Sequence, residues 1–182
     1  MNYCSQCGHP VVQRIPERDS RLRHVCDNCH TVHYQNPHIV CGCLPVWEDK
    51  VLLCRRAIEP RHGFWTLPAG FMENGETTPE AAARETFEEA AAPVDIGDLY
   101  AVFNIRHINQ VYMMFHARLK DGVFGVGEES LECRLFTEEE IPWDEIAFPT
   151  IARSLKYYFE DRKNGVFPFR MRDIELSFKR PE

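Results

Sequence analysis

Short stretches of apolar residues, separated by polar ones, predict several β-strands. Residues 38–46 and 51–56 are rich in Val, Leu and Cys, and the charged segment 48–50 between them is typical of a hairpin turn. Further apolar stretches predict later strands at residues 100–105, 110–119 and 132–136. The domain that contains these segments is therefore expected to be built on a β-sheet.

The alanine-rich run at residues 81–92 has the propensity and the end signals of an α-helix. Thr78 is the expected N-cap, since Pro79 suits the first helical position. Glu80 falls in the first turn, where the helix dipole favours an acidic residue, and Pro93 is expected to end the helix. This helix interrupts the series of predicted strands.

The C-terminal third predicts a second helix. Residues 149–162 place apolar side chains on one side of a helix. Before it, residues 137–140 have the spacing of a capping box and indicate a short helical turn. The partly apolar tail from Val166 onward is expected to pair or pack as a strand.

The character of the sequence changes near residue 34. Residues 1–34 contain two cysteine pairs and little apolar periodicity, and Asn36-Pro37 favours a turn at the joint. Strands interleaved with two helices follow, which is typical of an α/β domain. We therefore expect a small N-terminal module at residues 1–34 and an α/β domain at residues 35–182.

Four of the eight cysteines predict a structural zinc site. They form two C-x-x-C pairs with 18 residues between them: Cys4, Cys7, Cys26 and Cys29. Each C-x-x-C turn directs two sulfurs toward one point, and two such turns complete a tetrahedral zinc shell. Disulfides or free thiols are the alternative. Three nearby histidines could also replace a cysteine ligand: His9, His30 and His33.

Three glutamates of the first predicted helix are candidates for binding a divalent metal. Glu85, Glu88 and Glu89 lie three and four positions apart, so a helix places them on one face. Like charges at this spacing cost roughly 0.2–0.5 kcal/mol per pair. Mg²⁺ prefers carboxylate oxygens and usually also binds a substrate phosphate. The alternative is an acidic helix face exposed to solvent.

Charge and apolar runs narrow the possible partners. The net charge of −7 argues against a nonspecific grip on nucleic acid, which needs clustered Lys and Arg, so no nucleic-acid partner is expected. No apolar run approaches the ~20 residues that span a bilayer, so no membrane partner is expected. The first residues have no basic segment followed by an apolar stretch, which favours a reducing, cytoplasmic location.

The glutamates belong to a longer pattern, G-x5-E-x7-R-E-x-x-E-E. Its six fixed positions are Gly70, Glu76, Arg84, Glu85, Glu88 and Glu89. This segment resembles the Nudix box, and the match is specific because six positions agree across twenty residues. Thr86 stands where an aliphatic residue is usual, and Ala91 stands where glycine is usual. Both departures concern packing and the helix end.

The resemblance implies a Nudix α/β/α sandwich with a mixed sheet, preceded by an N-terminal zinc ribbon. It implies that Mg²⁺ or Mn²⁺ binds to the three helix carboxylates and to the Gly70 carbonyl. Arg84 would orient Glu85, and Glu76 would brace the loop. Water activated by the metal and a carboxylate would attack phosphorus in a small nucleotide substrate, breaking its pyrophosphate bond.

Further site residues are less sharply defined. Many Nudix members take another carboxylate from a later loop, for which the candidates are Glu128, Glu129 and Glu132. A solvated loop is the alternative for each. The candidate substrate contacts are Arg55, Arg56 and Trp65. Surface arginines and a core tryptophan are the alternatives here.

The likeness extends beyond the box, to the ribbon and to residues 34–37, 51–56, 63–70 and 129–136. These segments are similar to the zinc-ribbon Nudix group that includes the plant chloroplast FAD and ADP-ribose diphosphatase. This similarity implies cleavage of FAD or ADP-ribose to release AMP. The zinc-ribbon NADH diphosphatases rank second, because their Ser-Gln-Pro-Trp-Pro-Phe-Pro type motif is missing.

A different class of function is also open. A Nudix-like nucleotide sensor, or a ribbon that docks nucleic acid or protein, would not need the three helix glutamates. Their presence favours an enzyme. Many relatives act as homodimers, and we expect the same here.

Overall fold

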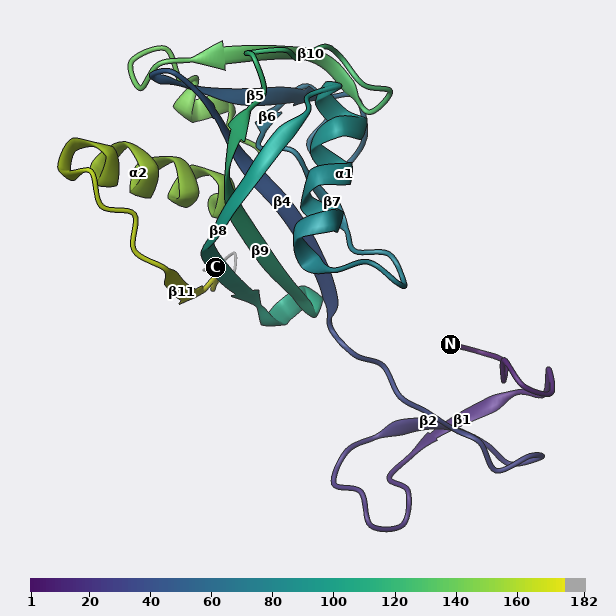
Figure 1. Cartoon of the computed structure of the whole chain (residues 1–182). Helices are drawn as coiled ribbons and strands as arrows, with labels where there is room; N and C mark the ends of the chain where they lie inside the picture. Colours follow the sequence, from purple (N-terminus) through teal and green to yellow (C-terminus); the bar gives the residue numbers. More distant parts are fainter. Residues whose placement is uncertain (176–182) are drawn as a thin grey trace, which may run out of the picture. The chain divides into compact units, whose positions relative to one another are not determined.

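The computed structural model describes residues 1–175 and divides the chain into two compact units, Met1–Pro37 and His38–Glu182. Figure 1 shows both units coloured along the sequence. The first unit is a three-stranded antiparallel sheet in the order β1-β2-β3. Its strands are β1 (Val11–Arg14), β2 (Arg23–Cys26) and β3 (Val32–His33). One cysteine pair lies before β1, and the other begins at the last residue of β2 and continues into the turn that follows.

The second unit combines a large sheet with two helices. Its strands are β4 (His38–Trp47), β5 (Lys50–Arg56), β6 (Trp65–Thr66), β7 (Ala69–Phe71), β8 (Val94–Ile105), β9 (Gln110–Leu119), β10 (Ser130–Phe136) and β11 (Arg170–Asp173). Its helices are α1 (Thr78–Ala90) and α2 (Pro149–Asn164), with short 3-10 turns at Arg106–Ile108 and Trp143–Glu145. The predicted hairpin, the later strands and both helices are therefore present.

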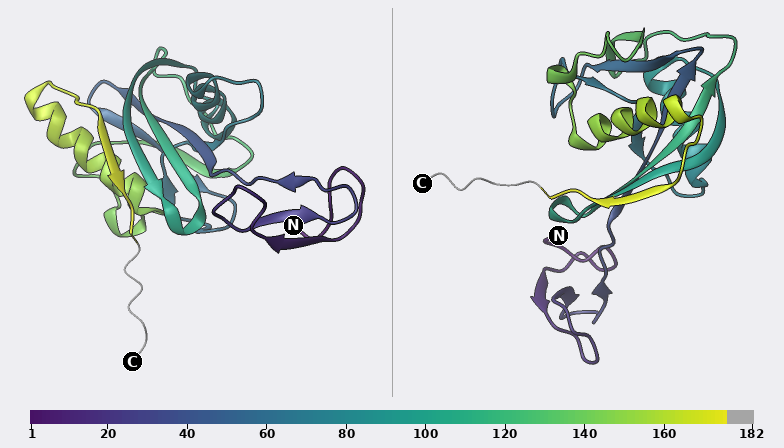
Figure 2. Two further views of the ribbon diagram at one scale, coloured as in Figure 1. Left: turned by 90° about the horizontal axis from the view of Figure 1, so that it is seen from below. Right: turned by 90° about the vertical axis from the view of Figure 1, so that its left-hand side faces the viewer.

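The sheet is mixed. Its main path runs β10-β5-β4-β9-β8-β11, while β6 pairs with β5 and β7 pairs with β4. The pairs β4–β9 and β8–β11 are parallel, and the other pairs are antiparallel. After α2 the chain turns back, so that β11 lies beside β8 (Figure 2). The tail thus pairs as a strand over Arg170–Asp173, and its residues 176–182 lie outside the described residues.

The alternating direction of the side chains along β4 and β5 explains why the two helices lie on opposite faces of the sheet. Cys43 of β4 and Leu52 of β5 belong to clusters that contain alanines of α1. Leu44 and Leu53, one position further along, pack into the cluster that contains Leu155 of α2. Successive side chains of a strand point to opposite faces, so each strand serves two cores. The helices consequently cover opposite sides of the central strands, as Figure 1 shows, and the predicted α/β/α sandwich is confirmed.

The start of α1 differs from the prediction by one residue. Thr77, rather than Thr78, is the N-cap, and its hydroxyl accepts a hydrogen bond from the Glu80 backbone N–H. The Glu80 carboxylate in turn accepts from the Thr77 backbone N–H at 2.8 Å. This reciprocal capping box requires the acid three positions after the cap, and Glu80 stands only two positions after Thr78.

The end of α1 and the region before α2 also differ in detail. The helix ends at Ala90 because Ala91 adopts a left-handed conformation, with φ of 45°. A C-cap in this conformation ends many helices and is usually glycine, which explains the residue that is usual at this position of the box. At Thr137 the predicted helical turn is a hydrogen-bonded turn, and the 3-10 helix begins later, at Trp143.

A buried ion pair ties the end of the chain to the sandwich. Asp161 of α2 accepts two hydrogen bonds from the Arg170 guanidinium of β11 and one from the Tyr100 hydroxyl of β8. Burial alone raises the pKa of Asp161, but the bonds from Arg170 and Tyr100 outweigh it, so the pKa is lowered.

No helix within residues 1–175 is both long and apolar enough to cross a membrane.

We expect Asp161→Asn to destabilise the second unit by about 3 kcal/mol, because it leaves the Arg170 charge buried without its partner. Since the folded-state pKa of Asp161 is lowered, its stabilisation is complete above the unfolded value of about 3.9 and is lost as pH falls through the folded value. Thermal unfolding of both proteins between about pH 3 and pH 7 should show a difference that shrinks in acid.

The matched control for this pair is Asp95→Asn. Asp95 pairs with Arg118 and Lys120 in solvent, and exposed ion pairs contribute little to stability. Its Tm should stay close to that of the wild type. Equal Tm values for Asp161→Asn and the wild type at neutral pH would show that the buried pair does not hold β11 in place.

Candidate active site

Arg84 of α1 is the centre of a network of charges. Its guanidinium donates to Glu76 at 2.6 and 3.0 Å, to Glu85 at 2.8 Å and to Glu88 at 2.9 Å. It also donates to the Phe71 carbonyl at 3.1 Å. One cation therefore fixes two glutamates of the helix and the loop before it. Its donors are also occupied, so Arg84 has little capacity left for a substrate.

Gly70 lies against the Glu85 carboxylate. A Cβ atom at Gly70 would come within 2.2 Å of Glu85 Oε2, so any side chain here would displace that carboxylate. Gly70 pairs with Cys41 in the short ladder between β7 and β4, which fixes the loop backbone beside α1. The glycine of the box is thus explained by close approach rather than by an unusual φ angle.

Glu89 is the most deeply buried of the helix carboxylates, with 6% of its surface exposed. Burial raises its pKa to about 8, and the Glu85 charge adds to the rise. Burial also raises the pKa of Glu85, although Arg84 opposes this shift. Carboxylates gathered in a low-dielectric cleft resist ionisation unless a cation is present. The cluster is therefore electrostatically suited to a divalent metal.

The loop between β9 and β10 docks on the C-terminal end of α1. The backbone N–H of Gly125 donates to the Ala90 carbonyl at 2.6 Å, and that of Gly127 donates to the Glu89 carbonyl at 3.0 Å. These bonds satisfy carbonyls that a helix end leaves free. Because the loop is docked in this way, Glu129 lies close enough to the carboxylates of α1 that its charge raises the pKa values of both Glu85 and Glu89.

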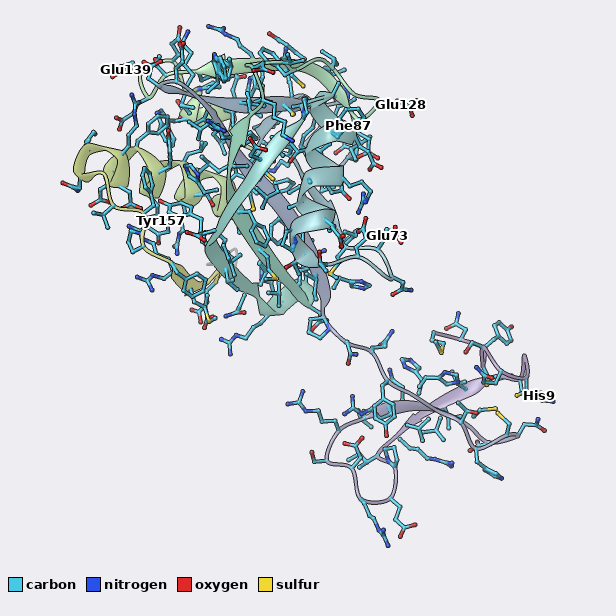
Figure 3. The ribbon with its side chains drawn as sticks, viewed as in Figure 1. His9, Glu73, Phe87, Glu128, Glu139 and Tyr157 are labelled. Carbon is cyan, nitrogen blue, oxygen red and sulfur yellow. The ribbon has the colours of Figure 1, made fainter. Side chains whose placement is uncertain are left out.

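A cleft of about 1220 Å³ brings most of the predicted residues together. It is lined by Gly70, Arg84, Glu85, Glu88, Glu89, Glu128, Glu129 and Arg56. Glu73, Phe87 and Glu128, which all line the cleft, are labelled in Figure 3, Phe87 on α1 and the other two on the loops beside it. The volume exceeds the ~1,000 Å³ upper range of pockets for drug-sized ligands, which leaves room for an extended dinucleotide.

Four predicted residues do not line the cleft: Glu76, Glu132, Arg55 and Trp65. Glu76 acts through Arg84, as described above. Trp65 is 6% exposed and packs edge-on against Phe136 in the core. Arg55 donates from Nε to the Gly63 carbonyl instead.

The sequence did not indicate that residues at the start of α2 line the cleft. Phe148, Pro149 and Thr150, at the start of that helix, line the cleft together with Tyr112 of β9 and Ile105 of β8. Phe148 lies under the Arg56 guanidinium, which is 5.2 Å from the ring centroid. No local signal marks such residues, because their place depends on how the helix packs against the sheet. An uncapped helix start beginning with proline was the available hint.

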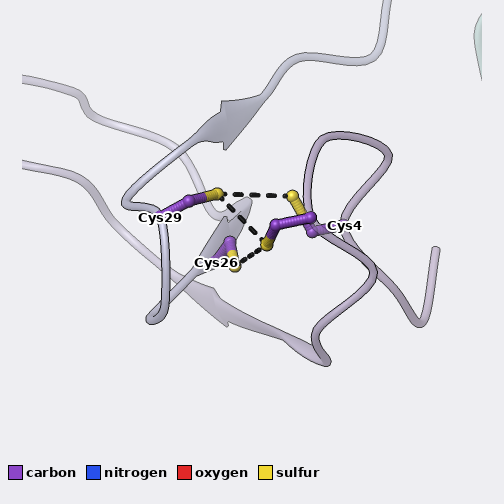
Figure 4. A group of neighbouring side chains, drawn as sticks. Cys4, Cys26 and Cys29 are labelled. Carbon is purple, nitrogen blue, oxygen red and sulfur yellow. Dashed lines mark hydrogen bonds between the residues drawn. The ribbon is translucent and has the colours of Figure 1, made fainter.

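The four cysteines of the first unit converge (Figure 4). Their sulfur atoms all lie within 4.8 Å of one another, and three of the pairs are 3.4 to 3.6 Å apart. Tetrahedral zinc with Zn–S bonds of ~2.3 Å separates its sulfurs by ~3.8 Å, so these distances suit zinc and exclude a disulfide. His33 Nε2 lies 3.3 Å from the Cys4 sulfur, outside the set of four.

The thiols also influence one another's ionisation. A backbone hydrogen bond from His9 contributes most to lowering the pKa of Cys7, to about 6. The Cys29 backbone lowers the pKa of Cys26, but burial and the neighbouring Cys7 outweigh it and raise that pKa to about 11. The cluster therefore needs a cation before all four sulfurs can be thiolates.

Comparison with protein families assigns both units. Residues 36–158 match the family described as NUDIX domain, and residues 2–35 match the zinc-ribbon family described as Nudix N-terminal. Among solved structures, a Nudix hydrolase from Nitrosomonas europaea is 57% identical, with a TM-score of 0.94 over 97% of this chain and 100% of that one. An ADP-ribose pyrophosphatase from Streptococcus suis, 20% identical with a TM-score of 0.62 over 75% of this chain and 99% of that one, shares the fold.

Curated relatives include enzymes named NAD-capped RNA hydrolase NudC. The protein from Edwardsiella ictaluri is 37% identical over 93 residues, which are 50% of this chain and 34% of its own length. The one from Vibrio atlanticus is 38% identical over 98 residues, 52% of this chain and 33% of its own. This chain therefore spans about a third of the length of the curated relatives it matches.

These names contradict the expectation that nucleic acid is not a partner. That expectation was based on net charge, which describes nonspecific binding along a nucleic-acid backbone. An enzyme that acts on the capped end of an RNA contacts the substrate at one cleft, so a negative overall charge does not exclude it.

The NUDIX domain covers more than half of the sequence, and the Nitrosomonas europaea hydrolase is similar over nearly all of it. This chain belongs to the Nudix hydrolase family and has the zinc ribbon that precedes the catalytic domain in one of its groups.

Proposed function

We propose that the protein is a metal-dependent diphosphatase that hydrolyses the P–O–P bond of a nucleoside diphosphate linked to another group. The observation that carries the proposal is the crowding of Glu85, Glu88, Glu89 and Glu129 in one large cleft. Carboxylates in such a position are costly unless they bind a cation. A diphosphate is the substrate group whose charge a divalent cation would offset.

The residues present fit Mg²⁺ or Mn²⁺. The proposed donors are all oxygens, which suit hard divalent cations. We propose Glu85, Glu88 and Glu89 as ligands, with the Gly70 carbonyl as a further one. When bound, the cation would polarise the phosphoryl oxygens and offset the charge that develops on them.

The surrounding residues have separate roles. Arg84 holds Glu85 and Glu88 in position, and Glu76 holds Arg84 through two hydrogen bonds. Among the three later glutamates we favour Glu129 as the carboxylate that accepts a proton from the attacking water, because it lines the cleft and its charge acts on Glu85 and Glu89. Glu132 pairs with Arg55 across β10 and β5, outside the cleft.

For the substrate, we propose FAD or ADP-ribose, with AMP as a product. The proposal follows the resemblance of segments outside the box to the FAD and ADP-ribose diphosphatase group. The size of the cleft accommodates a dinucleotide of this kind. A second candidate is the NAD diphosphate linkage, free or at the end of an RNA, because the curated relatives are named for NAD-capped RNA.

We propose that zinc at Cys4, Cys7, Cys26 and Cys29 is structural. Four sulfurs complete its shell and leave no position for water or substrate. Its binding would contribute to folding of a unit whose buried hydrophobic residues are few: Cys4, Val25 and Cys26.

The first test of function is a turnover panel with purified full-length protein. FAD, ADP-ribose, NADH and an RNA with a 5′ NAD cap are each incubated with Mg²⁺ and, separately, with Mn²⁺. We expect cleavage that requires added metal, with AMP released from FAD or ADP-ribose. Preference for NADH or the capped RNA would support the second candidate. Absence of cleavage of every substrate, with metal bound, would contradict the diphosphatase proposal.

We expect Glu89→Gln to reduce turnover to background without unfolding the protein, because glutamine keeps the shape of the side chain but removes the proposed charge for the metal. Glu129→Gln should lower kcat by about 10²-fold or more, the usual contribution of a general base. Glu132→Gln is the matched control and should keep wild-type rates, since it lies outside the cleft. Wild-type activity in Glu89→Gln would show that the proposed ligand set is wrong.

Cys26→Ser should lower the zinc content below one per chain and the thermal stability of the first unit, because a four-sulfur shell loses one ligand. Cys43→Ser provides the comparison, since Cys43 is buried in the second unit, and its zinc content should not change. Metal analysis of both purified variants measures this directly. Full zinc occupancy in Cys26→Ser would remove Cys26 from the ligand set.

A further inference from the structure

The start of α2 is an open helix N-terminus inside the cleft. Phe148 is the N-cap, and no side chain caps the helix. Pro149 has no N–H, and the Ile151 and Ala152 amides both donate to the Phe148 carbonyl at 3.1 Å. The Thr150 amide is left without a partner among residues 1–175. Because Phe148, Pro149 and Thr150 all line the cleft, the positive end of the helix dipole adjoins the substrate space.

The Thr150 side chain supplies a second, independent observation. Thr150 is 1% exposed, and its Oγ1 has no hydrogen-bond partner within the described part of the chain. Buried hydroxyls are nearly always hydrogen-bonded, since a lost bond costs about 1–3 kcal/mol. An unpartnered hydroxyl on the wall of a binding cleft is available to a ligand. The nearby Ser154 hydroxyl does not bond to Thr150 Oγ1, because it donates its hydrogen bond to the Thr150 backbone carbonyl.

Arg56 brings a positive charge to the same place. Its Nε donates to the Pro60 carbonyl at 2.9 Å, and its guanidinium lies over the Phe148 ring. These two contacts fix the side chain, and neither Nη group has a hydrogen-bond partner within the described part of the chain. Among residues 1–175 no carboxylate forms an ion pair with Arg56, whereas Arg84 is paired with three. Arg56 is therefore the cleft arginine next to α2 that has donors left for an anion.

We propose that Arg56, the Thr150 hydroxyl and the Thr150 amide form a subsite that binds a phosphate group of the substrate without the help of a metal. This inference rests on the proposed function, since the substrate is taken to contain a diphosphate. The α1 carboxylates repel phosphate and can hold it only through a cation. A diphosphate has two phosphate groups, and the second one needs donors. The start of α2 supplies a helix amide, a hydroxyl and a guanidinium in the same cleft.

The test is the binding of inorganic phosphate to full-length protein, followed by ³¹P NMR or calorimetry. Free divalent metal is removed with a chelating resin, and zinc content is checked so that the first unit stays loaded. We expect wild type to bind phosphate without Mg²⁺, and Arg56→Ala and Thr150→Val each to weaken binding about tenfold, as expected for loss of one charged or well-aligned contact. Thr150→Val should keep the wild-type Tm, because the hydroxyl that it removes has no partner among residues 1–175.

Two matched variants control for charge and for loss of a hydroxyl. Arg55→Ala removes the neighbouring arginine, which does not line the cleft. Ser130→Ala removes a second buried hydroxyl that has no partner within the described residues, and Ser130 also lies outside the cleft. Both should bind phosphate like the wild type. Equal weakening in Arg55→Ala and Arg56→Ala would show a diffuse charge effect and overturn the subsite.

Variants of the metal ligands and of the subsite distinguish failure of this inference from failure of the proposed function. Glu89→Gln should lose turnover but bind phosphate at least as tightly as the wild type, because the subsite does not use the metal ligands and the substitution removes a carboxylate that repels phosphate. With the best substrate of the panel, Arg56→Ala and Thr150→Val should raise KM more than they lower kcat. An active enzyme that binds phosphate only when Mg²⁺ is present, or binds it equally in Thr150→Val, would overturn the subsite and leave the diphosphatase intact. Phosphate binding that depends on Thr150 in a protein without turnover would support the subsite and contradict the proposed function.

Discussion

The mutual repulsion of the glutamates on α1 is the constraint around which the second unit is organised. Three carboxylates on one helix face, one of them buried, raise the free energy of the folded protein when nothing offsets them. Arg84 offsets part of this charge and is in turn held by Glu76 from the preceding loop. The remaining negative charge is what makes the cleft a place for a divalent cation. Gly70, the loop before the helix and the loop after β9 are all shaped to leave this cluster intact.

Features that depend on local sequence could be predicted. The hairpin of β4 and β5, both helices and the strand β9 follow from apolar spacing and from start signals such as Pro79 in the first turn of α1. The cysteine cluster and the gathering of Glu85, Glu88 and Glu89 follow from spacing alone. The one-residue error at the N-cap shows the limit of this reasoning, since Thr77 and Thr78 are equally good caps until the position of Glu80 is considered.

Features that depend on packing between distant segments could not be predicted. Glu129 and Glu132 are three residues apart in sequence, but only the docking of Gly125 and Gly127 on α1 places one of them in the cleft. Trp65 is buried because Phe136 of another strand covers it. Phe148 and Thr150 reach the cleft through the packing of α2. The error about nucleic acid has another origin: net charge averages over a whole surface, whereas recognition occurs at one cleft.

Gly127 has an implication for changing the enzyme. A Cβ atom there would lie 1.7 Å from the Glu88 carbonyl, so only glycine allows the loop to sit this close to the helix. The attachment of the loop thus depends on Gly127 and not on the identity of its neighbours, such as the exposed Val126. A replacement loop taken from another member of the family would attach at the same point as long as it kept this glycine and the amide that follows Val126. The loop can therefore be treated as an exchangeable part, through which new substrate preferences could be introduced while α1 and its glutamates are left unchanged.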